Sequence, residues 1–170
     1  MIRRRTVLSL LAAAPLARPA LAQDTWPNRP IRLLVGFPPG GGVDLLARVL
    51  AERMAPILGQ PVVIENRPGQ AAGLATELGA RAAPDGYTLT MANIGTMTIN
   101  PHLYRGYLDT TREVTPISRL VTYNVFVFTP ADLPARTLPE FVAHARARPG
   151  QLNYGSAGSG GITHIAAELL

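Results

Sequence analysis

Apolar positions in the first part of the chain change between the spacing of strands and that of helices. A short apolar run, Ile31–Val35, is typical of a strand that is buried on both faces, as in parallel sheets. Residues 43–58 then carry apolar side chains at helical spacing. Residues 61–65 and 87–92 predict two further strands, with a helix over 71–83 between them. This order predicts an α/β fold with right-handed crossovers and a parallel sheet that binds ligands at the carboxyl ends of its strands.

The second part of the chain has a less regular pattern. Residues 114–129 predict one or two strands, of which Val125–Phe128 is the clearest part. Thr137 and Glu140 have the spacing of a capping box, which predicts the start of a helix. Residues 151–154 predict a final short strand, followed by a glycine-rich loop and a helix that runs to the end of the chain.

The first 22 residues have the composition of an export signal. Three arginines, Arg3–Arg5, precede an apolar stretch over residues 7–17, and Ala20-Leu-Ala22 is a cleavage-site pattern. This stretch is shorter than the roughly 20 residues of a membrane-spanning helix. We therefore expect cleavage after Ala22 and a periplasmic mature protein. Arg4-Arg5 also fits the twin-arginine pattern loosely, so both the ordinary and the folded export route agree with this segment.

Charge and composition exclude several kinds of function. Beyond residue 22 the chain carries 12 Arg and 11 acidic residues, and the whole chain lacks both Cys and Lys. The scattered arginines form no basic patch in the sequence, which argues against nucleic acid as a partner. The lack of Cys and Lys excludes disulfides, thiolate metal sites, Cys nucleophiles and Schiff bases. His102, His144 and His164 are isolated in the sequence, so we predict no metal site and no other cofactor.

A glycine-rich bend follows the first predicted strand and contains Phe37, Pro38, Pro39, Gly40, Gly41 and Gly42. Consecutive glycines let the main chain approach a ligand, and the next helix turns its positive dipole end toward the same place. We predict that the bend contacts an anion, most simply a carboxylate; the alternative is a turn whose glycines serve only backbone geometry. Asp44 belongs to the candidate site, although a helix cap is its favoured role because a carboxylate repels an anionic ligand.

A second glycine-rich loop opens the last predicted helix. It contains Gly155, Ser156, Ala157, Gly158, Ser159 and Gly160, with Thr163 and His164 in the first turns of the helix. Two such loops would be able to face one ligand, and plain turn chemistry is the alternative. For His164 we favour a structural role. Because Ala157-Gly-Ser159-Gly-Gly161 is close to a nucleophile elbow, an exported serine hydrolase using Ser159 is a competing hypothesis.

Six sequence motifs occur in a fixed order between residues 26 and 170. They are Trp26-Pro-x-Arg-Pro-Ile31, Phe37-Pro-Pro-Gly-Gly-x-x-Asp44, Glu65-Asn-Arg-Pro-Gly69, Pro84-Asp-Gly-Tyr-Thr-Leu89, Asn100-Pro-x-Leu-Tyr104, and Asn153-Tyr-Gly-Ser-x-Gly158 with His164 and Glu168. Together they resemble the Bug-type periplasmic receptors, the substrate-binding components of tripartite tricarboxylate transporters. The chain departs from the family at Pro68-Gly-Gln-Ala-Ala-Gly73, where the family usually has more glycines, and at Gly161, where a Ser or Thr is common.

The resemblance implies a type II periplasmic-binding-protein fold, with two lobes built on mainly parallel sheets and no catalysed reaction. Residues 23–122 would form the first lobe and residues 123–170 the start of a second, truncated lobe, because members of the family are longer. The implied ligand is a small carboxylate, such as a di- or tricarboxylate, an amino acid or an aromatic acid, and the implied partner is the membrane permease. Besides the two glycine loops, the resemblance implies contacts from Asn93, Gly95 and Thr96 after the third strand. A non-functional receptor fragment is the remaining alternative.

Overall fold

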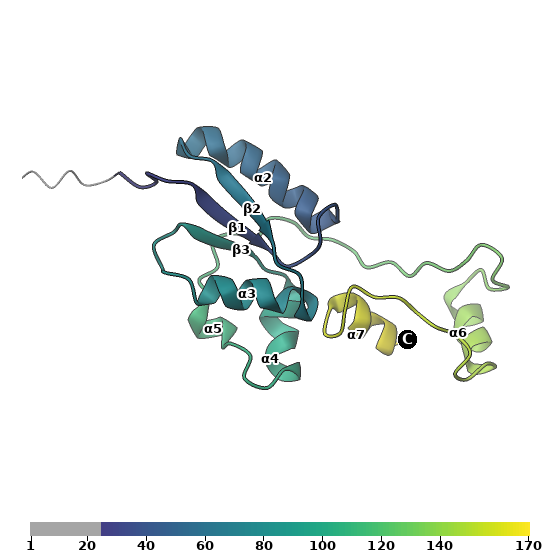
Figure 1. Cartoon of the computed structure of the whole chain (residues 1–170). Helices are drawn as coiled ribbons and strands as arrows, with labels where there is room; N and C mark the ends of the chain where they lie inside the picture. Colours follow the sequence, from purple (N-terminus) through teal and green to yellow (C-terminus); the bar gives the residue numbers. More distant parts are fainter. Residues whose placement is uncertain (1–24) are drawn as a thin grey trace, which may run out of the picture.

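A computed structural model describes residues 25–170, and its centre is a small parallel sheet (Figure 1). The strands are β1 (Ile31–Val35), β2 (Val62–Asn66) and β3 (Thr88–Met91), in the order β2-β1-β3. Both pairings with β1 are parallel. The predicted α/β fold with a parallel sheet is thus confirmed. The expected export signal lies outside the described residues.

Two crossover helices cover opposite faces of the sheet (Figure 1). Helix α2 (Gly42–Leu58) joins β1 to β2, and α3 (Gly73–Ala80) joins β2 to β3. Because β1 lies between its two partners, right-handed crossovers send the connections to different sides of the sheet. Helix α3 is shorter than the predicted 71–83, since residues Gln70–Ala72 form a separate 3-10 turn, η1.

The hydrophobic core lies between α2 and the sheet. Leu33 and Val35 of β1, Ala47 of α2 and Met91 of β3 are buried together there. Strand β1 is buried at every position except Arg32, because it has a neighbouring strand on each edge and a helix on each face. This burial confirms the prediction of a buried strand made from the four apolar residues of this run.

Five short helical segments follow β3. They are the π-helical turn η2 (Gly95–Ile99), α4 (Asn100–Leu103), α5 (Thr110–Glu113), α6 (Leu138–Arg146) and α7 (Ile162–Glu168). The capping box predicted for α6 is formed: Glu140 N donates to Thr137 Oγ1 at 3.4 Å, and Thr137 N donates to Glu140 Oε2 at 3.3 Å. Among residues 25–170 there is no helix with both the length and the apolarity needed to cross a membrane.

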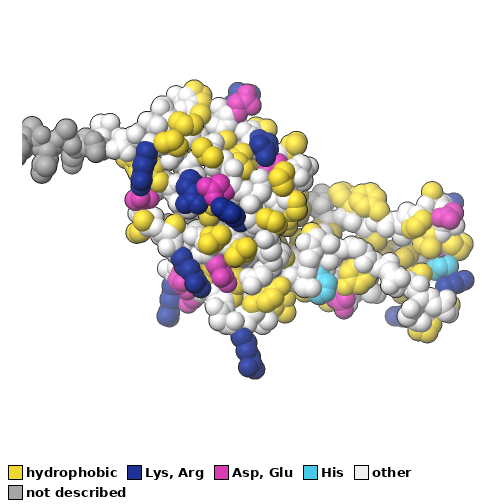
Figure 2. Space-filling view, in the orientation of Figure 1, with side chains coloured by type: hydrophobic (Ala, Val, Ile, Leu, Met, Phe, Trp, Pro, Cys, Tyr) yellow, Lys and Arg dark blue, Asp and Glu magenta, His cyan; other side chains and the backbone are white. Residues whose placement is uncertain are grey.

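Residues 114–129 and 151–154 contain no strand, so these two predictions are wrong. A strand needs a neighbour that satisfies its backbone N–H and C=O groups, and the described chain provides none for either segment. Their apolar side chains are exposed as a consequence: Phe126 is 70% exposed and Phe128 88%. Apolar side chains also gather on the surface around α6, which projects away from the sheet (Figures 1 and 2).

Candidate functional site

A cavity of about 450 Å³ lies at the carboxyl ends of β1 and β2. Its lining consists of Gly36, Phe37, Pro38, Pro68, Gly69, Gln70, Ala71, Ala72, Tyr104, Ala157, Gly158 and Ser159. Parallel α/β folds bind their ligands at this end of the sheet, and the volume suits a small molecule. The lining comes from four separate parts of the chain, and none of its side chains is charged.

The cavity brings the two predicted glycine loops together. Five predicted residues line it: Phe37, Pro38, Ala157, Gly158 and Ser159. The other predicted residues lie outside the lining: Pro39, Gly40, Gly41, Gly42, Asp44, Asn93, Gly95, Thr96, Gly155, Ser156, Gly160, Thr163 and His164. The second loop is held in place by the Tyr104 hydroxyl, which donates to Ser159 O at 2.8 Å. Gly160 is buried beside it, and a Cβ there would lie 3.0 Å from Asn100 Oδ1, so the loop packs closely on α4.

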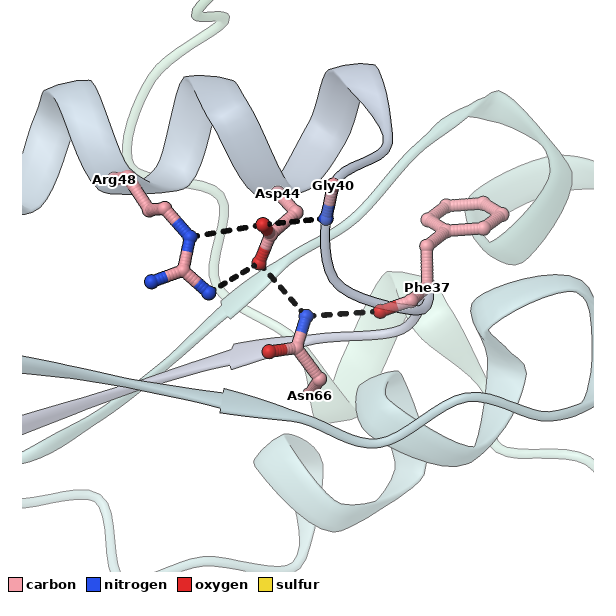
Figure 3. Close-up of polar contacts among 5 residues, drawn as sticks. All are labelled: Phe37, Gly40, Asp44, Arg48 and Asn66. Carbon is pink, nitrogen blue, oxygen red and sulfur yellow. Dashed lines mark hydrogen bonds and ion pairs between the residues drawn. The ribbon is translucent and has the colours of Figure 1, made fainter.

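The Asp44 carboxylate occupies the N-terminus of α2 (Figure 3). Only 1% exposed, it accepts hydrogen bonds from Gly40 N, Asn66 Nδ2 and Arg48 Nε, each at 2.9 Å. The bond from Arg48 is the main cause that holds the pKa of Asp44 far below its ordinary value, and the bonds from Gly40 and Asn66 act in the same direction. Asp44 therefore ties the first turn of α2 to Gly40, the residue before the N-cap; the N-cap itself is Gly41, and no side chain caps the helix, so Asp44 is not the N-cap that the sequence favoured.

This network changes the role expected for the first glycine bend. The Asp44 carboxylate and its partner Arg48 already lie at the start of α2, and the Gly40 amide is already paired with that carboxylate. Asn66 Nδ2 also donates to Phe37 O at 2.9 Å, which ties the bend to the end of β2 (Figure 3). Asp44 and Asn66 thus hold Phe37 at the cavity, but neither of the two residues lines the cavity itself.

The helix N-terminus that borders the cavity belongs to α3. Gln70, Ala71 and Ala72, which precede this helix, line the cavity with φ values of 49°, 49° and 76°, in the left-handed region. Ala72 is the N-cap of α3 and makes no side-chain capping bond. The fully buried Asn100 holds the turn, since its Nδ2 donates to Gln70 O at 3.0 Å. The first two amides of α3 are already paired, because Gly73 N donates to Gln70 O and Leu74 N donates to Gly69 O at 3.4 Å. What α3 presents to the cavity is therefore the positive end of its dipole, whereas the sequence had pointed to α2 for this purpose.

The polar groups of the second loop are largely used within the loop. Ala157 N donates to Thr163 Oγ1 at 3.1 Å, and Gly158 N donates to Ser156 Oγ at 3.4 Å. His164 Nδ1 accepts from Gly160 N at 3.5 Å, and its Nε2 lies 4.0 Å from Glu168 Oε1. Within residues 25–170 no hydrogen bond joins the Ser159 hydroxyl to His164, so the arrangement is that of a structural histidine.

Asn93, Gly95 and Thr96 support the second loop from behind. Asn93 N donates to Thr96 Oγ1 and Thr96 N donates to Asn93 Oδ1, each at 3.1 Å, which closes a tight turn after β3. A Cβ on Gly95 would lie 3.3 Å from Gly160 O, so the turn is in contact with the loop. Over the described residues, no three His, Cys, Asp or Glu side chains gather where they would hold a metal ion.

The residues that sequence reasoning missed at the cavity are Gly36, Pro68, Gly69, Gln70, Ala71, Ala72 and Tyr104. The one available signal was that residues 68–73 differ from the family pattern, because Gln and Ala occur in a segment that is usually richer in glycine. Tyr104 carried no signal, because an aromatic side chain in an irregular segment is most often a packing residue.

The sequence also matches known proteins. A family profile described as "Tripartite tricarboxylate transporter family receptor" matches residues 46–170. A UPF0065 protein of Bordetella pertussis is 41% identical, over 100% of this chain and 51% of that protein. Protein BugT of the same organism is 34% identical, over 99% of this chain and 52% of that protein. The chain spans about half the length of these curated relatives.

Two solved structures share the fold. One, described as "Structure of a periplasmic transporter", has a TM-score of 0.67 and 32% identity, covering 85% of this chain and 49% of that one. The other, "R. palustris Rpa4515 with adipate", has a TM-score of 0.68 and 30% identity, covering 85% and 48%. The resemblance drawn from six short motifs is confirmed by the match over most of the sequence and by these structures. The chain belongs to the receptor family of the tripartite tricarboxylate transporters.

Proposed function

We propose that the protein is a periplasmic receptor that binds a small organic carboxylate and delivers it to the membrane permease of a tripartite tricarboxylate-type transporter. The observation that carries this proposal is that one cavity is lined by both the loop after β1 and the loop before α7. Membership of the receptor family supports the transport role. A structural neighbour described with adipate, a dicarboxylate, supports the class of ligand.

The cavity would hold a carboxylate mainly through neutral groups. The N-terminus of α3 turns the positive end of its helix dipole toward the cavity, while its first two amides already bond to Gln70 O and Gly69 O. Ser159 adds a hydroxyl, and Gln70 adds an amide. In this proposal residues 23–122 belong to a first lobe and residues 123–170 to a second, and the ligand lies between them.

Binding without catalysis fits the geometry of the second loop. A serine hydrolase needs a base within hydrogen-bond reach of its nucleophile, whereas His164 Nδ1 faces the Gly160 amide. We therefore assign Ser159 to ligand contact. His164 holds the loop on α7, and export through the N-terminal signal would bring the receptor to the periplasm.

A thermal-shift screen of the purified mature protein tests the proposal. The ligands are di- and tricarboxylates, amino acids and aromatic acids, each supplied in large excess. A ligand at about 100 times its Kd adds about 2.7 kcal/mol to the free energy of unfolding, which raises the Tm by several degrees. If no member of the panel raises the Tm, the proposal is wrong.

Two matched tyrosine variants test whether this cavity is the site. Tyr104→Phe removes the hydroxyl that donates to Ser159 O, so the second loop loses its tether and we expect about fivefold weaker binding of the best ligand. Tyr123→Phe removes the hydroxyl of a side chain that is 55% exposed and outside the cavity, and should leave binding unchanged. If both variants change the affinity for the best ligand equally, the ligand does not bind in this cavity.

A further inference from the structure

The walls of the cavity are apolar, and few side chains are able to bond a ligand hydroxyl. Phe37, Pro38, Pro68 and Ala157 contribute only hydrocarbon side chains. The Tyr104 hydroxyl already donates to Ser159 O, so its proton is in use. Only Gln70 and Ser159 remain as side chains with polar atoms, and the two carboxylate ends of a diacid would compete for them.

Ala71 and Ala72 form part of this wall at a cost in backbone energy, and of the two only Ala71, which is 8% exposed, keeps surface that a ligand can touch. Both have positive φ, a conformation that glycine adopts freely and alanine does not. Ala72 is fully buried, and its Cβ would lie 2.2 Å from a Cβ at Gly36, so the methyl group fills the space beside the end of β1. Ala71 lies beneath the second loop, with its Cβ 3.6 Å from the position of a Cβ on Gly161.

We infer that Ala71, together with the hydrocarbon side chains beside it, makes the cavity selective for carboxylates with a hydrocarbon body over hydroxylated acids of the same length and charge. The inference rests on the proposed function and narrows its ligand class. A hydrocarbon segment that packs against the Ala71 methyl group and the side chains of Phe37 and Pro38 is stabilised by leaving water. A hydroxyl in the same place gives up its bonds to water without finding a partner, and its affinity falls accordingly.

The test uses two six-carbon diacids that differ only in their inner carbons. Adipate has four CH₂ groups, and galactarate carries a hydroxyl on each of the four. We measure both dissociation constants by titration calorimetry on the mature protein. We expect adipate to bind at least about tenfold more tightly than galactarate. Succinate against tartrate repeats the comparison with four-carbon diacids and should give the same direction.

Ala71→Ser separates the chemistry of the wall from its shape. This variant keeps a Cβ at the same left-handed position and adds one hydroxyl, so the ratio of the two dissociation constants should fall about fivefold toward galactarate. Ala143→Ser is the control, because Ala143 belongs to α6, away from the sheet and the cavity (Figure 1), and should leave the ratio unchanged.

The outcomes separate this inference from the function on which it rests. If carboxylates bind but galactarate is bound as tightly as adipate, the receptor function stands and the inference is wrong. If Ala71→Ser and Ala143→Ser give the same ratio of the adipate and galactarate dissociation constants, the selectivity does not come from this wall. The assignment to Ala71 is then overturned. If no carboxylate in the panel binds, both proposals fall together.

Discussion

Two apolar runs of the chain differ in burial: one is buried in the sheet and the other is exposed. Val35 ends β1 with no exposed surface, whereas Phe128 ends the run at residues 125–128 and is 88% exposed. The first run pairs with β2 and β3 and is covered by α2 and α3. The second has no neighbouring strand within the described residues. A strand-like pattern therefore predicts structure only where the chain also provides partners for its edges and faces.

A similar contrast is found at four glycines of the two regions. Around the sheet, Gly36 and Gly73 have no room for a Cβ, while Gly150 and Gly155 in the later region have open space around theirs. The cavity lies where the two regions meet, at residues 157–159. The cavity thus combines the closely packed ends of β1 and β2 with the loop at residues 157–159, which Tyr104 holds.

Amide hydrogen exchange should show the largest difference. Arg32 N donates to Tyr87 O at 2.8 Å inside the sheet, so its exchange requires opening of the core. The amides of residues 125–128 have no ladder partner and should exchange freely. We expect protection of Arg32 to exceed theirs by about a thousandfold or more. Similar protection in the two runs, measured by NMR or mass spectrometry, would show that residues 125–128 pair in solution.

Gly36→Ala should give the largest loss of stability. The new Cβ would lie 2.2 Å from Ala72 Cβ and 2.4 Å from Ala72 Cα, so the backbone must move, at a cost of about 3 kcal/mol. Gly155→Ala is the control in the later region, where nothing lies within 4 Å of the new Cβ, and should change stability by less than about 0.5 kcal/mol. Urea unfolding measures both.

Adding Ala72→Gly to Gly36→Ala sharpens this comparison. It removes the closest of the clashing atoms and should recover part of the loss, although the contact with the Ala72 backbone remains. No recovery in the double variant would mean that the clash is not between these two residues.

A matched pair of valine substitutions tests burial alone. Val35→Ala removes two buried methyl groups from the core and should cost about 2 kcal/mol. Val127→Ala makes the same change at a position that is 56% exposed and should cost less than about 0.5 kcal/mol. If the two variants lose similar stability in urea, the later region is packed in solution and the contrast between the two regions fails.

The sheet, its order and its crossover helices were predictable because each apolar run has a partner encoded nearby. The cavity wall was only partly predictable. Gln70, Ala71 and Ala72 are residue types that rarely adopt positive φ, so no sequence rule places them in such a turn. The role of α2 was misjudged because Asp44 bonds back to Gly40 N and is held by Arg48, one turn further along α2, and by Asn66 at the end of β2.

The stability of the two regions should also depend on pH in different ways. Of the differences predicted here, we expect this one to be the smallest. Hydrogen bonding to Arg32, aided by Arg67, lowers the pKa of Glu65 to about 2 from an ordinary 4.5. A carboxyl with a lowered pKa in the folded state contributes stability that is complete above its ordinary pKa and disappears as the pH falls toward the lowered one. Glu65→Gln should therefore flatten the loss of stability between about pH 5 and pH 3.

Tyr154 provides the opposite case in the later region. The bond that its hydroxyl donates to Glu168 raises the pKa of Tyr154 above its ordinary 10.0. The contribution of Tyr154 to the free energy of unfolding is therefore complete below pH 10.0 and is lost as the pH rises through the raised pKa. Tyr154→Phe should flatten only the loss of stability at alkaline pH. Because Tyr154 is 54% exposed, solvent screening keeps this change small. Urea midpoints across the pH range measure both limbs, and an acid limb unaltered by Glu65→Gln would rule out the Arg32 pairing as a source of stability.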